Sequence, residues 1–251
     1  MENSIKKDYS LSSAGLHIIA MALMLCDHSW STLFPEHVWL TCLGRMTFPI
    51  FAFMIVEGFF HTHDIKKYFK RLFIFAVLSE VPFDLIYEGS FFYPFHQNVM
   101  WEFIIGLAAL CVLEKIKENQ NLVVKIIGYP VTVVAAILLP FACFTDYYGH
   151  GIMTILVFYF FHGRKWWCFL GQLIGLWYIN YEVMGGYCFF VTLFGHEFEI
   201  VQQSIAVLAL IPIWLYRGRQ GYHAKWFQYF CYAFYGLHCA ILYIIGYLVF
   251  A

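Results

Sequence analysis

The sequence contains few charged residues, and no polar stretch in it is long enough to form a separate soluble domain. Asp, Glu, Lys and Arg make up 12% of the 251 residues, whereas 62% are hydrophobic. A soluble protein of this size could not expose a surface of that composition to water. We therefore expect an all-α, polytopic membrane helical bundle, in which residues 1–251 form a single integral-membrane domain.

Cysteine patterns that bind metals are also missing. The eight cysteines stand singly, mostly within apolar runs, without a CxxC motif or a Cys/His pair at the spacing of metal ligands. Packing in an apolar core is the common role of such cysteines. We therefore expect no metal centre. A disulfide between Cys143 and Cys188, both placed near the outer surface, is the less favoured alternative.

Lysine and arginine are absent from four predicted connections, at 35–37, 88–97, 143–148 and 183–199. The nine predicted helices lie at 14–34, 38–60, 71–87, 98–114, 123–142, 149–162, 166–182, 200–216 and 226–250. An apolar piece at 187–194 is too short to cross a bilayer. If the N-terminus is cytoplasmic and successive helices cross the membrane in alternating directions, fourteen of the fifteen basic residues lie inside, Lys6 and Lys7 among them. The positive-inside rule therefore predicts nine spans, with Ala251 outside.

The first predicted span carries Asp27 and His28 at membrane depth. A charged side chain there costs roughly 2.5 to 3.5 kcal/mol, so it needs a partner or a function. His17, Met24 and His28 share one helix face, which we expect to look into the protein. Adjacent residues point about 100° apart, so Asp27 should face another span. The alternative for His28 is a buried histidine bound to a backbone carbonyl.

The one basic residue that breaks the positive-inside rule is Arg45, early in the second span. A guanidinium at that depth needs a carboxylate, and Asp27 is the nearest candidate across a short turn. The sequence therefore predicts a buried ion pair. Further polar residues in the same outer half predict a polar pocket that opens outward. The alternative for two of them, Asp84 and Asp146, is that they are exposed at the ends of loops and have no role in a pocket. These residues are Asp84, Asn98, Glu102 and Asp146.

Basic loops gather on the inner side, in the stretches DIKKYFKR, KIKENQN, HGRK and YRGRQGYHAK. Topology and contact with anionic lipids are one explanation of this charge. The alternative is a binding site for the phosphates of a nucleotide-like cofactor, in which Gly218 would let the backbone come close to a phosphate. In the last span His238 is a second titratable group at membrane depth.

Seven stretches of this sequence resemble, in colinear order, the TraX family of membrane proteins, which are linked to N-terminal acetylation of conjugative pilin. They are IIAMALMLCDH, LGRMTFPIFAFMIVEGFFHT, KYFKRLFIFAVLSEVPFD, NVMWEFIIGLAAL, DYYGHGIMTILVFYF, LYRGRQG and FYGLHCAIL. The second stretch is the most specific, because it combines a membrane arginine, a proline and a polar helix end. The family looks related to the broader multispan acyltransferases. The resemblance implies acyl transfer from an acyl-coenzyme A in a bacterial inner membrane, with His28 as the catalytic residue.

Residues and resemblance together give an expected mechanism. An acceptor amine or hydroxyl attacks the thioester of acetyl-CoA, and His28 takes the proton that the acceptor loses. Such general base catalysis typically raises the rate by about 10² to 10⁴-fold. Arg45 holds Asp27 or stabilises the oxyanion. A covalent acyl-histidine is a further alternative. Residues expected to bind acetyl-CoA are His17, Lys67, Arg71, Arg217, Gly218 and Arg219.

The acceptor is expected to be a peptide amine or a surface glycan that enters from outside. Residues expected to contact it are Glu57, Asn98, Glu102, Asp146 and His238. Besides these substrates we expect membrane lipids as partners and no nucleic acid. The rival function is a proton-coupled transporter or export permease that uses the same buried Asp, His and Arg. No inverted repeat is evident in the sequence to support that alternative.

Overall fold

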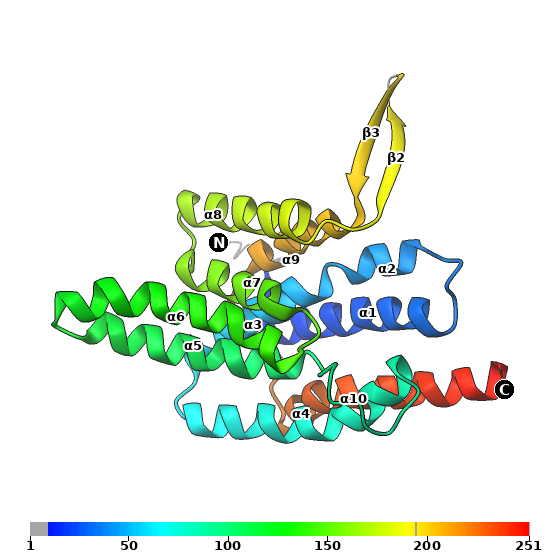
Figure 1. Cartoon of the computed structure of the whole chain (residues 1–251), viewed down its shortest axis with the longest axis horizontal. Helices are drawn as coiled ribbons and strands as arrows, with labels where there is room; N and C mark the ends of the chain where they lie inside the picture. Colours follow the sequence, from blue (N-terminus) through cyan, green and yellow to red (C-terminus); the bar gives the residue numbers. More distant parts are fainter. Residues whose placement is uncertain (1–9, 194, 251) are drawn as a thin grey trace, which may run out of the picture.

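The computed structural model describes residues 10–193 and 195–250, so the expected positions of Lys6, Lys7 and Ala251 lie outside the described residues. The α-helices are α1 (Ser13–Thr32), α2 (Trp39–Gly44), α3 (Thr47–His61), α4 (Ile65–Tyr87), α5 (Met100–Glu118), α6 (Leu122–Cys143), α7 (Tyr148–Phe160), α8 (Trp166–Trp177), α9 (Leu210–Leu215) and α10 (Lys225–Phe250). Most of them run along one common direction (Figure 1).

Each helix predicted from the apolar runs has a counterpart, with four differences in detail. The second one is broken at Arg45 and Met46 into α2 and α3. The helix predicted at 71–87 begins earlier, at Ile65, because the Asp64 side chain accepts a hydrogen bond from the Lys67 backbone and caps it. Helix α8 continues into the π-helix η1 (Tyr178–Val183), and α9 is preceded by the 3₁₀-helix η2 (Gln202–Ala209).

The all-α prediction needs a correction, because the chain also forms short strands. The apolar piece predicted at 187–194 is strand β2 (Cys188–Leu193), which pairs antiparallel with β3 (His196–Val201). Aromatic and β-branched residues favour such strands, and Gly195, at a φ of +77°, lies between them. The hairpin projects away from the helices (Figure 1). In addition, β1 (Leu11–Ser12) pairs parallel with β4 (Tyr216–Arg219).

Helix α3 lies at the centre of the fold and packs against α1, α5 and α7. Its residues Ile50, Ala52 and Val56 are fully buried. Helix α10 packs along α4 and also contacts α1. The chain therefore brings the first and last long helices together beside the central one, which places groups from both ends of the sequence in one site.

The surface of the bundle carries large apolar areas. On α6, Leu122, Ile126 and Leu138 are 67%, 63% and 59% exposed. Water disfavours such a surface, whereas lipid accommodates it. Three helical segments in the described part of the chain are long and apolar enough to cross a bilayer: Trp39–His61, Leu122–Cys143 and Lys225–Phe250. The protein is therefore a membrane protein, while nine crossings stay a prediction.

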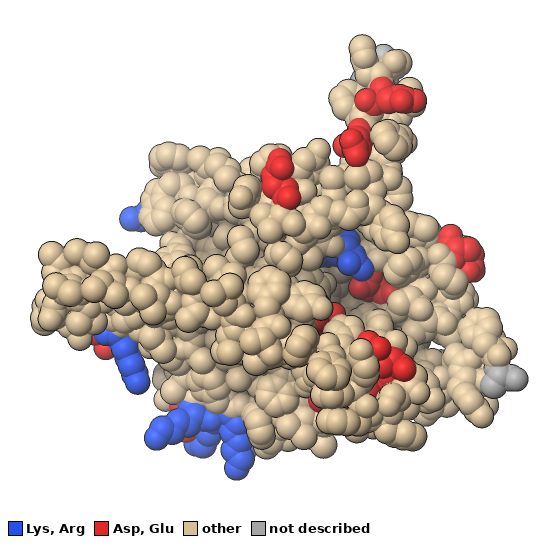
Figure 2. Space-filling model, in the orientation of Figure 1, with Lys and Arg blue, Asp and Glu red and all other residues tan. Residues whose placement is uncertain are grey.

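Charge is unevenly distributed between the two ends of the helices. Figure 2 shows Lys and Arg gathered at lower left, where α4 begins, and Asp and Glu mainly toward the right, where α1 and α10 end. One basic group lies instead in a hollow among acidic ones. This separation agrees with a basic inner face and an acidic outer face.

The predicted topology can be tested by cysteine labelling. In a cysteine-less background, cysteines introduced at Glu88 and Glu197 should react with an impermeant maleimide in intact cells, because both positions belong to the acidic face. A cysteine at Lys117, at the basic end of α5, should react only after the membrane is permeabilised. Labelling at Lys117 in intact cells would contradict this orientation.

Candidate functional site

Two adjoining cavities lie inside the bundle. The cavity toward the basic end of the helices, which we call the inner cavity, has a volume of about 690 Å³, and the one toward the acidic end, which we call the outer cavity, about 280 Å³. Both are lined by the same five residues where they meet: Met24, Phe51, Val99, Phe103 and Tyr235. These five side chains therefore mark the boundary between the two cavities, which lie one after the other along one face of α1.

The predicted ion pair lies in the outer cavity. A guanidinium nitrogen of Arg45 donates to Asp27 Oδ1 over 2.7 Å, and both residues line the cavity. The same nitrogen donates to Thr41 Oγ1 at 2.7 Å, while Nε donates to the Thr41 carbonyl at 3.2 Å. The remaining nitrogen donates to Gln203 Oε1 at 3.3 Å. The predicted pairing is confirmed, although the pair is only partly buried, with the Arg45 and Asp27 side chains 23% and 19% exposed, and every nitrogen of the guanidinium has a partner.

Gly44 makes this pairing sterically feasible. A Cβ atom at this position would overlap the Asp27 side chain, so a larger residue would push α2 away from α1. The glycine before Arg45 thus lets the two helices approach closely at the depth of the pair. This explains physically why the LGR stretch has a glycine directly before its arginine.

The ion pair extends into a chain of buried amides that the sequence did not predict. Gln203, on η2, donates from Nε2 to Asn180 Oδ1 at 2.9 Å. Asn180, on η1, donates in turn to the Leu176 carbonyl at 2.8 Å. The available signal was the presence of single amide residues within otherwise apolar runs. Arg45 therefore links the α1–α3 region to the segments after α8.

His28 also lines the outer cavity, on the neighbouring side of α1. Its Nδ1 lies 2.6 Å from Nε2 of His238, which comes from α10 and is 3% exposed. His238 lines neither of these cavities and lies behind His28, so the cavity linings give no support to its expected contact with the acceptor. The alternative for His28, a bond from its ring to a backbone carbonyl, is not the contact found.

Two residues expected at the outer pocket have other roles. Asn98 is fully buried and donates to the Ala76 carbonyl at 2.9 Å, while its Oδ1 accepts from the Met100 backbone at 3.0 Å. It therefore ties the start of α5 to α4. Glu102 is fully buried with its carboxylate against Gly151. Neither residue lines the outer cavity, whereas Asp146 does, as predicted.

The rim beside Asp146 is held by a histidine that the sequence analysis overlooked. His96 lies between Glu88, 2.8 Å from its Nδ1, and Asp146, 3.3 Å from its Nε2. The bond to Asp146, followed by that to Glu88, raises the pKa of His96 to about 9. A protonated His96 thus bridges two carboxylates and holds the α4–α5 connection against the start of α7.

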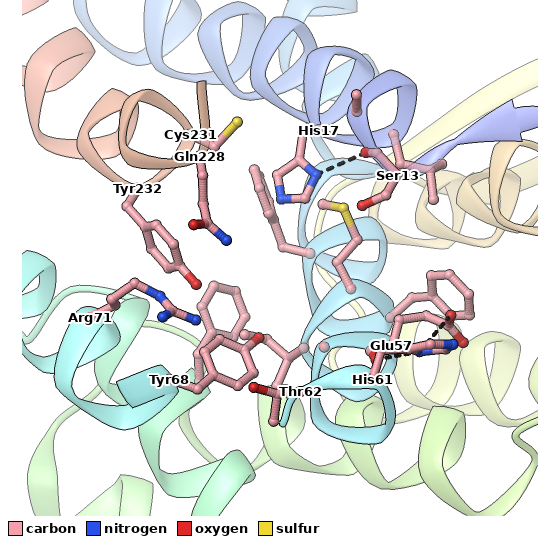
Figure 3. A pocket seen from close by; sticks show the side chains of 18 of the residues that line it. Ser13, His17, Glu57, His61, Thr62, Tyr68, Arg71, Gln228, Cys231 and Tyr232 are labelled. Atoms are coloured by element: carbon pink, nitrogen blue, oxygen red, sulfur yellow. Dashed lines mark hydrogen bonds and ion pairs between the residues drawn. The ribbon is translucent and has the colours of Figure 1, made fainter. Parts of the chain in front are cut away.

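The inner cavity is lined by three of the residues expected to bind the donor, His17, Arg71 and Gly218. The Arg71 guanidinium lies 5.7 Å from the ring centre of Tyr68 and 5.8 Å from that of Tyr232. Figure 3 shows these side chains together on one side of the cavity. Arg71 lines this cavity, so its positive charge can attract an anion that enters it.

The other predicted donor residues are not part of this cavity lining. Lys67 is exposed and pairs with Asp64 at 3.1 Å. Arg217 and Arg219 are exposed on β4, on either side of Gly218. Gly218 has a φ of +77°, which favours glycine. The backbone of this turn therefore approaches the cavity, while its two arginines do not line it.

Glu57 was expected to contact the acceptor, but it lines the inner cavity. One of its carboxylate oxygens lies 2.6 Å from Nε2 of His162. Figure 3 shows Glu57 and His61 on the side of the cavity opposite Arg71. Glu57 therefore lies with the residues that line the inner cavity, apart from Asp146 in the outer one.

The Asp27–Arg45 pair should stabilise the fold. Asp27→Asn and Arg45→Gln should each lower the melting temperature in detergent, because each leaves the other charge without its partner; the cost of about 3 to 5 kcal/mol for a fully buried pair is the upper bound for this partly buried one. Glu36→Gln is the matched control, since Glu36 is exposed and its nearest partner, His37, is 3.5 Å away. If Asp27→Asn and Arg45→Gln are both as stable as the parent protein, the structural role of the pair is contradicted.

The His96 bridge should make part of the stability depend on pH. Because folding raises its pKa, the bridge contributes fully below about pH 6.5, the ordinary histidine value, and this contribution is lost as the pH rises through about 9. The difference in melting temperature between parent and His96→Gln should shrink over that interval. His37→Gln, which removes an exposed histidine, is the control. A constant difference would contradict the charged bridge.

The sequence is similar to one family of known proteins. A model of the TraX protein family matches residues 12–246. The probable fimbrial assembly protein FimC of Dichelobacter nodosus is 30% identical over 119 residues, which are 43% of this chain and 49% of that protein. The match thus spans about half the length of this curated relative. No solved structure matches the chain. Because the family model covers nearly all of the sequence, the chain belongs to the TraX family.

Proposed function

We propose that this protein is a membrane acyltransferase that moves an acetyl group from acetyl-CoA in the inner cavity to an amine or hydroxyl in the outer cavity. The observation that carries the proposal is the meeting of the two cavities beside His28. Met24, one helical turn before His28, lines both of them. A donor and an acceptor that enter from opposite ends would therefore meet at this histidine. Membership of the TraX family supports this proposal.

The inner cavity suits the donor in volume and charge. Its volume of about 690 Å³ falls within the range of pockets that enclose organic ligands. Arg71, which lines this cavity, is the group that would bind a phosphate of coenzyme A. His17 lies on the same face of α1 as Met24, nearer the inner end, so the pantetheine arm could follow this face toward His28.

The chemistry requires one base and one attacking group. His28 takes the proton of the acceptor N–H or O–H while the acceptor attacks the carbonyl carbon of the thioester. The tetrahedral intermediate then expels the coenzyme A thiolate, which receives the proton from His28. The C–S bond is broken, a C–N or C–O bond is formed, and no external proton source is needed. Proton transfer within one site suits a region shielded from water.

Arg45 contributes chiefly by fixing Asp27. Its nitrogens already donate to Asp27, Thr41 and Gln203, so little of its hydrogen-bonding capacity is left for an oxyanion. Its positive charge still lies on the cavity wall, where it favours negative charge developing on the carbonyl oxygen. Arg45 was expected either to hold Asp27 or to stabilise the oxyanion. Its hydrogen bonds favour the first of these roles.

The acceptor would enter from the acidic outer end. Two carboxylates, Asp27 and Asp146, line the outer cavity beside one arginine, Arg45, and the predicted outer connections contain no lysine or arginine. This charge favours a neutral or cationic acceptor over an anionic one. The relative in D. nodosus is named for fimbrial assembly, so a pilin-like peptide amine is the first acceptor to try, followed by surface glycans.

A proton-coupled transporter is the second candidate, because adjoining cavities could also form the path of a carried solute. In that function Asp27, His28 and Arg45 would relay protons. Titration of the detergent-solubilised protein with acetyl-CoA in a calorimeter separates the two functions. An acyltransferase binds acetyl-CoA and transfers its label to an acceptor, whereas a transporter of another solute does neither.

Loss of His28 should abolish transfer and spare donor binding. His28 lies about 20 Å above the start of its helix, at 1.5 Å per residue, whereas Arg71 lines the inner cavity. His28→Ala should bind acetyl-CoA with nearly unchanged affinity by calorimetry and should lose at least about 10²-fold in the rate of label transfer. Substantial turnover by this variant would contradict the role of His28.

Arg71→Ala tests the donor site. Because Arg71 places a positive charge on the wall of the inner cavity, its removal should weaken acetyl-CoA binding by about tenfold or more, a loss typical of one charged hydrogen bond. Arg217→Ala is the matched control, since Arg217 is an exposed arginine that does not line the cavity. Equal weakening by both variants would mean that the general basic charge, and not this cavity, attracts the donor.

A further inference from the structure

The two histidines in the membrane, His28 and His238, form a hydrogen-bonded pair that joins α1 to α10. Nδ1 of His238 lies 2.7 Å from the carbonyl oxygen of Phe234, and Nε2 of His238 lies 2.6 Å from Nδ1 of His28. The ring centres are 4.6 Å apart and the ring planes are inclined by 27°. These contacts determine where the ring protons must be.

A carbonyl oxygen can only accept a hydrogen bond, so Nδ1 of His238 carries a proton. A neutral imidazole has only one ring proton, and Nε2 of His238 is therefore an acceptor. The hydrogen between the rings must then belong to Nδ1 of His28. As a consequence, Nε2 of His28 is left unprotonated, with a free lone pair.

The surroundings favour two neutral rings. Among the described residues, no carboxylate forms a hydrogen bond with either imidazole, and the rings pack edge-on against Tyr87 and Tyr235. Asp27, the nearest acid in sequence, is bound to Arg45. A charged imidazolium without a carboxylate partner is unfavourable in such a buried place.

We infer that His238 is a positioning residue, which holds His28 in the tautomer whose Nε2 can act as the base. This inference rests on the proposed acyl transfer. His28 lines the outer cavity and His238 does not, so only His28 can touch a substrate. When His28 accepts a proton, its Nδ1–H continues to donate to His238, which stabilises the charged ring. His238 thus takes the place of the acid in a Ser-His-Asp triad without adding a negative charge.

A metal ion is the competing explanation of this cluster, because Cys239 Sγ lies 3.6 Å from Nδ1 of His28 and 3.8 Å from Nε2 of His238. Two nitrogens that bind one zinc ion at 2.0–2.1 Å in a tetrahedral site stand roughly 3.3 Å apart. The observed 2.6 Å between the nitrogens is the length of a shared hydrogen bond. The geometry therefore favours the hydrogen-bonded pair.

The proton positions can be measured without any turnover. In protein labelled with ¹⁵N-histidine, the His28 ring should show a protonated Nδ1 and an unprotonated Nε2 above about pH 7, with signals assigned by their loss in His28→Ala. A proton on Nε2 of His28 in the parent would overturn the inference, and so would zinc bound stoichiometrically in the purified protein and lost in Cys239→Ala.

Three variants test the consequence for the rate. His238→Leu removes the acceptor and should lower kcat by about 10-fold to 100-fold with unchanged affinity for acetyl-CoA, whereas His238→Gln, whose carbonyl can accept from Nδ1–H, should recover part of the loss. Cys239→Ala, the control at the next position, should keep the parent rate and the parent tautomer. Parent-like kcat in His238→Leu would overturn the positioning role.

The two proposals fail in different ways. If the chain shows the expected tautomer but transfers no acetyl group to any acceptor and does not bind acetyl-CoA, the proposed function fails, and the catalytic role of His238 fails with it. If the chain transfers acetyl groups while His28 carries its proton on Nε2, only the inference about His238 is overturned. Should His238→Leu not fold, the spectrum of the parent protein still decides the proton positions.

Discussion

A carboxylate and a guanidinium inside an apolar helix bundle are each unfavourable alone, and the rest of the site depends on how this protein pairs them. Arg45 lies at the break between α2 and α3, where its charge meets Asp27 of α1. Gly44 allows the two helices to come close enough for the bond. Because Asp27 and His28 are neighbours on α1, fixing Asp27 toward Arg45 also fixes the rotation of the helix. That rotation turns His28 toward the outer cavity and α10.

The same rotation explains how one helix can serve both cavities. Side chains one or two turns apart on α1 lie on one face, so His17 lines the inner cavity, Met24 lines both and His28 lines the outer one. The two cavities differ in their charged side chains: Arg71 and Glu57 line the inner one, whereas Asp27, Asp146 and Arg45 line the outer one. In the proposed reaction this difference would direct an anionic donor and a neutral or cationic acceptor to opposite ends.

The sequence could predict the parts of this arrangement that follow from local pattern. Apolar runs placed the helices, and the cost of an isolated charge in the membrane predicted the Asp27–Arg45 pair. Contacts between distant segments were beyond such reasoning: His28 and His238 are 210 positions apart, and two titratable residues in different spans do not reveal that they touch. Charge alone likewise could not separate Arg71, which lines a cavity, from Arg217, which is exposed. The hairpin was missed because a short apolar piece can form either a strand or a helix.

The pairing of two histidines is a physically sensible arrangement for a base in this location. A carboxylate as the partner of His28 would need its own counter-charge, and the nearby Arg45 is already committed to Asp27. A neutral His238 can orient His28 through one hydrogen bond without adding a charge to the bundle. When the proposed reaction forms an imidazolium and an oxyanion, the two new charges arise as a pair beside an ion pair that is already balanced. The site therefore begins and ends each turnover with no uncompensated charge, which is the condition that an apolar environment imposes most strongly.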